Sequence, residues 1–257
     1  MPSVCCALAA CGSVASSNHN DAAIDATTAD AWSASCVAPK LITPIENGNT
    51  TFSGPCLHAQ WYLQALNGTT TPTAPGRPMN TVDVVPTAIT LGSNALDQAS
   101  TYAVHVSGEG QTNISTTTFS YAQLTLALNT LSSTQIGTVD ASAFTGIQFY
   151  GKITVAASGL RLTVADLYTD PSGGMCSTSG GATGCFDAPG YKLAASADWK
   201  MYQVPFADLM QIGFGNPSPT GGLFPKDKII NLKWDVGIPA QGATGPWEIW
   251  VDDLTFY

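Results

Sequence analysis

The most distinctive chemistry in this chain lies in its last strand-like segment, residues 247–257. Two neighbouring carboxylates, Asp252 and Asp253, stand there among aromatic and β-branched residues that suit a half-buried pleated surface. Burying charged carboxylates is costly unless something compensates their charge, and a bound cation is the simplest compensation. Because side chains alternate along a strand, the two acids can reach one ion only if a bulge interrupts the strand. Asp252 is the preferred ligand.

A second group of polar side chains alternates with apolar ones in two other segments. Gln148 and Tyr150 do so in residues 146–154, and Arg161 and Thr163 in residues 159–167. We expect their polar faces to form one sheet surface that binds carbohydrate, because aromatic faces stack on sugar C–H groups and planar polar groups bond hydroxyls. An ordinary solvated sheet face is the alternative.

Four further residues complete the predicted ligand contacts. Trp61 and Tyr62 follow a cysteine-containing loop and either line a cleft or pack in the core. Asp166 and Asp170 lie where a predicted strand enters a loop, and they either bond sugar hydroxyls or shape a turn.

No catalytic residue is assigned. A glycosidase needs two carboxylates on either side of the scissile bond, roughly 5–9 Å apart. No motif pairs the candidate acids, which are Asp166, Asp170, Asp187 and Glu248. The G-x-S-x-G sequence of many serine hydrolases is absent. The three histidines, His19, His58 and His105, do not form a metal-ligand spacing.

Composition favours strands and turns over helices. Charged residues make up 11% of the 257 residues, while Gly (25) and Pro (16) are frequent; soluble domains typically have about 25% charged residues. The net charge is −9 and no basic run occurs, so nucleic acid is not expected as a partner. The sequence contains no apolar run of about eighteen residues, the length that would indicate a membrane span.

Short strand-like runs separated by Gly- and Pro-rich turns recur from residue 41 onward. This pattern predicts an all-β fold, an antiparallel β-sandwich or jelly roll. The expected strands are residues 41–45, 60–65, 101–107, 146–154, 159–167, 200–204, 229–236 and 247–257. Only residues 121–131 and 206–212 are expected to form short helices.

The N-terminal region suggests export. Residues 8–11 resemble a bacterial lipobox, in which the cysteine, here Cys11, is lipidated after cleavage. We interpret residues 1–10 as a truncated lipoprotein signal, although they lack a positive n-region and an Ala-rich leader is the alternative. Residues 11–38 have few large apolar groups and are interpreted as a flexible tether, followed by a single domain at residues 39–257.

Cysteine counting supports the same compartment. After the leader and Cys11 are set aside, four cysteines remain, enough for two disulfides. Cys176 and Cys185 bracket one loop and are predicted to pair, which leaves Cys36 for Cys56. The expected location is secreted or on the cell surface as a bacterial lipoprotein, in the periplasm or on the outer surface.

Three stretches together resemble a known family. They are residues 143–152, which include G-I-Q-F-Y-G-K, residues 198–209, which include D-W-K-M-Y-Q-V-P-F, and residues 249–254, I-W-V-D-D-L. They resemble the galactose-binding-like β-sandwich of carbohydrate-binding modules, particularly family 11, over roughly residues 41–257. Tyr150 stands where tryptophan is frequent in such modules, and the insertion with Cys176 and Cys185 is not a general feature of family 11.

The resemblance implies a jelly-roll sandwich with structural Ca²⁺. In such modules an acidic residue near the first strand and an Asp of the last strand share the ion. The matching residues are Glu46 and Asp252, with Asp253 as a near alternative. Carboxylate and carbonyl oxygens are suitable ligands for this ion. The alternative is that Glu46 caps a turn and both aspartates are solvated.

These observations predict an exported, non-catalytic, monomeric protein that binds a polysaccharide or oligosaccharide. A membrane would be contacted only through the lipid at Cys11. Two alternatives remain open, a jelly-roll polysaccharide hydrolase or lyase and a structural surface or adhesion protein.

Overall fold

The structure, a computed structural model, describes residues 36–42, 51–54, 57–66, 83–86, 102–108, 112–113, 121–132, 135–155, 160–179, 184–217, 224–236, 242–243 and 246–257. Residues Ala34–Tyr257 form one compact unit. The predicted leader, Cys11 and Glu46 lie outside the described residues. Within the described ranges, no helix has the length and hydropathy needed to cross a membrane.

The described part of this unit is built from strands and three short 3-10 helices. The strands are β1 (Cys36–Val37), β2 (Thr51–Ser53), β3 (His58–Leu66), β4 (Asp83–Pro86), β5 (Tyr102–Gly108), β6 (Thr112–Asn113), β7 (Tyr121–Ala127), β8 (Thr130–Ser132), β9 (Gln135–Ile136), β10 (Val139–Asp140), β11 (Gly146–Val155), β12 (Leu160–Asp166), β13 (Gly190–Leu193), β14 (Ser196–Pro205), β15 (Ile229–Val236), β16 (Gly242–Ala243) and β17 (Trp247–Phe256). The helices are η2 (Pro171–Gly173), η3 (Phe206–Asp208) and η4 (Lys226–Lys228). The domain therefore includes β1, which begins inside the stretch expected to be tether.

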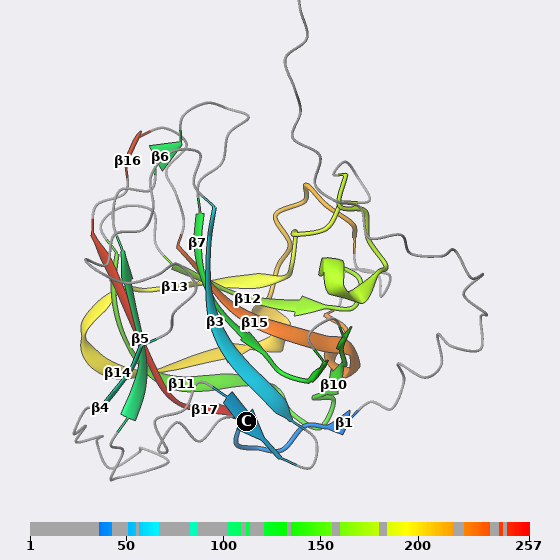
Figure 1. Cartoon of the computed structure of the whole chain (residues 1–257), viewed down its shortest axis with the longest axis horizontal. Coiled ribbons are helices and arrows are strands. Elements are labelled where there is room, and N and C mark those ends of the chain that lie inside the picture. The colour runs from blue at the N-terminus through cyan, green and yellow to red at the C-terminus, as the bar shows by residue number, and fades with distance from the viewer. Residues whose placement is uncertain are drawn as a thin grey trace, which may run out of the picture. The chain divides into compact units, whose positions relative to one another are not determined.

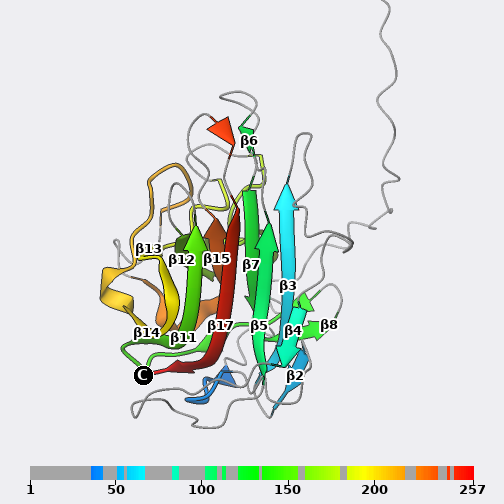
Figure 2. The same cartoon turned by 90° about the vertical axis from the view of Figure 1, so that its left-hand side faces the viewer.

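Two sheets form the sandwich that the sequence predicts (Figure 1). The first sheet has the order β13-β12-β15-β7-β3-β2, and β10 and β1 extend it from the start of β15. The second has the order β14-β11-β17-β5-β4, and Figure 2 shows β11, β17, β5 and β4 side by side. Neighbouring strands are antiparallel except for the short β1–β10 pair. The fold class is an all-β sandwich.

The core lies between the sheets and follows the alternation of the strands. Leu160, Leu162 and Val164 of β12 point inward and are almost completely buried, as expected. Trp234 of β15 is fully buried and packs against Trp61, with ring centroids 5.3 Å apart. Contact between aromatic rings from several strands fixes how the layers pack.

The helix expected at residues 121–131 is wrong, because its first seven residues form β7 in the middle of the first sheet. Alanine and leucine favour helices, which explains the error. The side chains nevertheless alternate between two faces: Ala122, Leu124 and Leu126 belong to the core cluster, while Gln123 and Thr125 lie on the opposite face, where Thr125 is also buried. Tertiary pairing on both sides overrides local propensity here. The other expected helix, at residues 206–212, shrinks to η3.

A bulge interrupts β17 at its two acids. Gln148 of β11 pairs with Thr255, and Tyr150 pairs with Asp252, so β17 has one extra residue between the pairs. Asp253 takes a left-handed conformation at this bulge, with φ of 47°. Both acids are buried, and the Asp253 amide donates to Asp252 Oδ1 at 2.9 Å. The strict alternation of side chains between the two faces of β17 is therefore broken at Asp252 and Asp253.

Replacing Leu162 by alanine tests the core assignment. The side chain is fully buried, so Leu162→Ala should lower the free energy of unfolding by about 2–5 kcal/mol, because a cavity remains. Lys192→Ala on the exposed side of β13 is the control and should change it by less than about 0.5 kcal/mol. Urea unfolding measures both. Equal stabilities of the two variants would contradict the assignment.

Candidate functional site

The outer face of the first sheet carries a continuous set of polar side chains, which we call the polar face. It consists of Lys192 of β13, Arg161 and Thr163 of β12, Asn231, Lys233 and Asp235 of β15, Gln123 and Thr125 of β7, and Tyr62 of β3, together with Asp170 from the turn after β12. These positions alternate with the buried core positions on each strand. The sandwich therefore presents this face away from the core.

Strand register aligns four of these residues in one row, the polar ladder. Lys192 pairs with Arg161, Arg161 with Asp235, and Asp235 with Gln123. Neighbouring strands are about 4.8 Å apart, so the ladder extends for roughly 14 Å across four strands. Lys192 is exposed and the other three are half-buried. A row of this kind offers donors and acceptors at regular spacing to an extended ligand.

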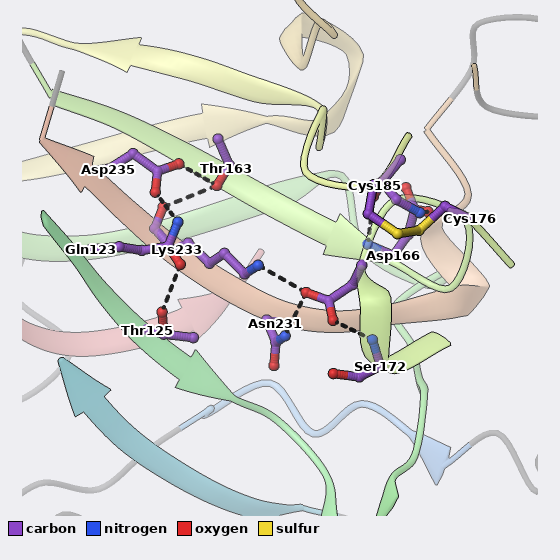
Figure 3. Close-up of polar contacts among 12 residues, drawn as sticks. Gln123, Thr125, Thr163, Asp166, Ser172, Cys176, Cys185, Asn231, Lys233 and Asp235 are labelled. Carbon is purple, nitrogen blue, oxygen red and sulfur yellow. Dashed lines mark hydrogen bonds and ion pairs between the residues drawn. A yellow bond between two sulfur atoms is a disulfide. The ribbon is translucent and has the colours of Figure 1, made fainter. Parts of the chain in front are cut away.

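Hydrogen bonds hold the centre of the ladder in place (Figure 3). The Asp235 carboxylate accepts one bond from Gln123 Nε2 and one from Thr163 Oγ1, the latter at 2.7 Å. Desolvation raises the pKa of Asp235, and these two hydrogen bonds offset the shift only in part.

Arg161, the neighbour of Asp235 in the ladder, is fixed by contacts on its β13 side. Its Nη2 donates to the carbonyl of Met210, and its guanidinium lies over Gly190 of β13. A Cβ at position 190 would lie 2.7 Å from Arg161 Nε, too close for any other residue type without movement of the arginine. Glycine at this position lets the arginine lie flat across β13.

A buried ion pair lies in the row next to the ladder, where Lys233 pairs with Thr163 and Thr125. Lys233 Nζ contacts Asp170 Oδ2 at 2.8 Å, and the side chains are 11% and 4% exposed. Asn231 Nδ2 donates to the same oxygen at 3.0 Å, and the Ser172 amide donates to Asp170 Oδ1 at 2.9 Å (Figure 3). Burial alone would raise the pKa of Asp170, but Lys233 and the hydrogen bonds from Ser172 hold it below its ordinary value. Both partners therefore stay charged at neutral pH.

Asp166 lies at the end of β12, beside the disulfide loop (Figure 3). It is fully buried, and its Oδ1 accepts bonds from the amides of Tyr168 at 2.8 Å and Thr169 at 3.1 Å. Burial raises the pKa of this carboxyl to about 6, because the amide bonds do not fully compensate the lost hydration. Asp166 therefore shapes a turn rather than facing a ligand.

The disulfide between Cys176 and Cys185 is present, as predicted. Cys56 lies outside the described residues, so the pairing of Cys36 with Cys56 stays a prediction.

The predicted ligand contacts divide between two sheets. Arg161 and Thr163 are on the polar face, and half-buried Tyr62 pairs with Thr125 at its β3 side. Gln148 and Tyr150, on β11, belong to the second sheet. The expectation that both pairs form one surface is therefore wrong: each segment alternates as expected, but periodicity does not reveal which strands pair.

The remaining predicted contacts have structural surroundings. Trp61 is 5% exposed and packs in the core, so it does not line the polar face. Tyr150 is 7% exposed and belongs to a small cluster with Ala103, against which Trp199, Met201 and Trp250 pack. Asp170 reaches the polar face only as the buried partner of Lys233.

Six members of this face were not predicted from the sequence: Gln123, Thr125, Lys192, Asn231, Lys233 and Asp235. The signal for two of them was present, because Lys233 and Asp235 alternate with Leu232, Trp234 and Val236 in a predicted strand. Gln123 was hidden by the wrong helix assignment, and Lys192 lies on a short strand that was not expected.

The carboxylates considered for catalysis are engaged in local structure. Asp187 accepts bonds from four consecutive backbone amides, those of residues 212–215. Glu248 Oε1 lies 2.9 Å from His105 Nε2 on the second sheet. Together with buried Asp166 and ion-paired Asp170, these acids stabilise turns and sheet faces, which gives no support to an acid–base pair among them.

The bulge on β17 is compatible with the proposed calcium ligands. Ile42 donates from its amide to the Leu254 carbonyl at 2.9 Å, and Phe256 donates to Lys40 at 2.8 Å. Residues 40–42 therefore lie antiparallel to the end of β17, and Ile42 is four residues before Glu46 in the sequence. Buried, oxygen-only side chains at such a position suit Ca²⁺. Within the described ranges no group of three His, Cys, Asp or Glu residues gathers, and Glu46 lies outside them.

Comparison with known proteins finds similarity only among solved structures. No protein-family model and no curated protein matches the chain. A family 11 carbohydrate-binding module of a cellulosomal cellulase from Clostridium thermocellum aligns over 86% of this chain and 95% of its own, with 15% identity and a TM-score of 0.45. A family 11 module from the same organism, in complex with a β-1,3-1,4-mixed-linked tetrasaccharide, covers 86% and 96%, with 14% identity and a TM-score of 0.45.

A family 30 carbohydrate-binding module from a cellulosomal cellulase of C. thermocellum covers 76% of this chain and 90% of its own, with 16% identity and a TM-score of 0.42. No residue role is transferred from these modules.

Asp166→Asn tests the surroundings of the buried carboxyl. Because the pKa of Asp166 is raised to about 6, the native protein binds more protons than the unfolded chain between about pH 4 and 6. The contribution of Asp166 to the free energy of unfolding is fully present below about pH 4 and is lost as pH rises through 6. The substitution should remove this fall of the free energy of unfolding with pH, which amounts to up to about 3 kcal/mol between pH 4 and 7.

The measurement is urea unfolding across this pH range. Asp198→Asn, an exposed position on β14, is the control and should keep the wild-type slope. A wild-type slope in the Asp166 variant would show that this carboxyl is not the titrating group.

Proposed function

We propose that this protein is a non-catalytic carbohydrate-binding module whose polar face binds a polysaccharide or oligosaccharide. The observation that carries the proposal is the polar ladder, in which Lys192, Arg161, Asp235 and Gln123 align across four strands. A sugar chain lying across the strands would meet cationic, anionic and amide groups in turn. Sites that hydrogen-bond a ligand's hydroxyls discriminate strongly against analogues that lack them.

Pre-organisation supports the same function. Arg161 and Asp235 are already held by protein hydrogen bonds, so little side-chain entropy would be lost on binding. Tyr62, half-buried beside Thr125, would offer a ring face at the β3 side of the site. The buried Lys233–Asp170 pair would keep the centre of the face rigid.

Export of the protein, with a lipid anchor at Cys11, belongs to the proposal. The Cys176–Cys185 disulfide supports it, because disulfides persist in oxidising compartments such as the periplasm. A module tethered to a surface would hold polysaccharide close to the cell.

The binding proposal is tested by affinity electrophoresis of the folded protein on soluble glucans, including a mixed-linked β-glucan, and on xylans and mannans. The double variant Arg161→Met, Gln123→Ala removes the two ladder residues that flank Asp235. It should weaken binding about tenfold or more, since hydrogen bonds to charged groups contribute about 1.5–3 kcal/mol each.

Gln203→Ala is the matched control, because Gln203 is exposed on β14 of the second sheet. It should bind as the wild type does. Absence of retardation of the folded wild type by every polysaccharide would contradict the proposal, and unchanged binding by the double variant would contradict the placement of the site.

We also propose that Ca²⁺ binds between Glu46 and Asp252, with Asp253 nearby, and joins the chain at Glu46 to β17. A ligand present at about 100 times its Kd stabilises the native state by about 2.7 kcal/mol. Removing Ca²⁺ with a chelator should then lower the Tm by about 5–10 °C for a domain of this size. Asp252→Asn should abolish this difference, and a wild-type Tm insensitive to both chelator and added Ca²⁺ would contradict the ion.

A further inference from the structure

We infer that the loops around the disulfide form an apolar extension of the polar ladder, which binds the C–H faces of sugar rings in the same polysaccharide chain. We call this extension the apolar rim: Met210, Ile212 and Phe214, with Phe186 and Met175 beside them. The inference rests on the proposed carbohydrate-binding function and adds a preference for long chains that pass beyond the edge of the sheet.

Exposed apolar side chains are concentrated in these loops. Of the seven large hydrophobic residues that are exposed in the described part of the chain, five belong to the rim. Met210 is 71% exposed, Ile212 69% and Phe214 56%. Isolated exposed hydrophobics are ordinary, but a concentration of them marks an interaction site.

A single carboxylate fixes the loop that carries three of these side chains. Asp187 Oδ1 accepts from the Ile212 amide at 2.8 Å, and Oδ2 accepts from the amides of residues 213–215 at 2.7–3.2 Å. Asp187 itself is 1% exposed. The backbone is therefore held from inside, and the side chains of Ile212 and Phe214 are left facing solvent on a fixed support.

Neighbouring loops are bound to the same support. Asn216 Nδ2 donates to the Tyr168 carbonyl at 3.0 Å, and its amide donates to Gly184 at 2.7 Å. The Cys176–Cys185 disulfide closes the adjoining loop. Phe186 has a φ of 79°, unfavourable for a side chain of its size, yet 60% of it is exposed. The Phe186 amide donates to the Thr169 carbonyl at 2.9 Å, and its neighbours Cys185 and Asp187 are buried, so the backbone is held in this conformation with the ring facing solvent.

The apolar rim continues the polar face beyond its β13 edge. Met210 forms a bridge with Gly190, and their amides and carbonyls bond reciprocally at 2.9 and 3.1 Å. Gly190 pairs in turn with Thr163, so Met210 occupies the next position of a row that crosses the sheet. Arg161 spans the junction, because it lies over Gly190 and donates to the Met210 carbonyl. In the ladder itself the residue after Arg161 is Lys192, and Met210 lies in the neighbouring row with Gly190 and Thr163. A ligand on the ladder therefore has this loop beside it at the β13 edge.

Charge favours a sugar chain over a lipid surface as the occupant. Residues 167–191 and 201–217 contain no Lys or Arg but include Asp170, Asp187 and Asp208. Attachment to an anionic membrane depends on clustered basic residues, which these loops lack. A neutral polysaccharide, polar at its hydroxyls and apolar on its ring faces, matches both the ladder and the rim. Self-association or a protein partner is an outcome that the test separates.

The experiment compares binding of oligosaccharides of increasing length with the parent polysaccharide, taken from whichever glycan retards the wild type. The variant is Ile212→Ser, Phe214→Ser, which keeps the backbone bonds to Asp187. It should bind short oligosaccharides like the wild type but lose about tenfold in affinity for the long chain, the value of burying one large apolar side chain. Leu131→Ser, 53% exposed on β8, is the matched control and should lose nothing.

The outcomes are distinct. If the variant loses the higher affinity for long chains while its Tm and its affinity for short oligosaccharides stay unchanged, the rim is supported. Equal affinities of variant and wild type for every length overturn the rim and leave the proposed function standing. Failure of the wild type to bind any glycan overturns the proposed function itself and the rim with it. A wild type that self-associates in sedimentation, where the variant does not, and that shows no dependence of affinity on chain length also overturns the rim.

Discussion

The ion pair between Lys233 and Asp170 is the interaction on which the rest of the site depends. It joins the middle of β15 to the turn that follows β12, and Asn231 strengthens it from the same strand. Removing either partner would leave an uncompensated buried charge, which typically costs about 3–5 kcal/mol. The pair therefore fixes the turn that leads into the disulfide loop. Replacing both Lys233 and Asp170 by well-packed hydrophobic residues could give equal stability. Stability alone therefore does not account for the pair, whereas its charges make this part of the sheet polar.

Strand register converts this local rigidity into an extended surface. Because β12 and β7 flank β15 in antiparallel register, every second residue of the three strands falls into a cross-strand row. One row is buried and contains Lys233; the next is partly exposed and contains Asp235 and Arg161. Gly190 and the Met210 bridge carry the rows across β13 onto a loop. Polar and apolar parts of the surface thus share one framework, and each is held by buried carboxylates, Asp170 and Asp187.

Sequence patterns predicted the sandwich, the faces of β11 and β12 and the Cys176–Cys185 bridge, because each depends on alternation or on short spacing. They could not predict that β11 and β12 belong to different sheets, since pairing is set by contacts between residues far apart in the chain. This explains why Arg161 was placed beside Tyr150. The same limit hid Gln123, whose segment favours a helix locally but is held between two strands.

The ladder groups keep bonding capacity for a ligand although the protein already uses them. An arginine has five N–H donors, and the bond to Met210 engages one side of the guanidinium. A carboxylate has about four acceptor sites, of which Asp235 uses two for Gln123 and Thr163. The bonds that fix these side chains are therefore not the ones that a sugar hydroxyl would need. Binding can add to the network without breaking it, which is the condition for a pre-organised site to gain affinity rather than exchange one hydrogen bond for another.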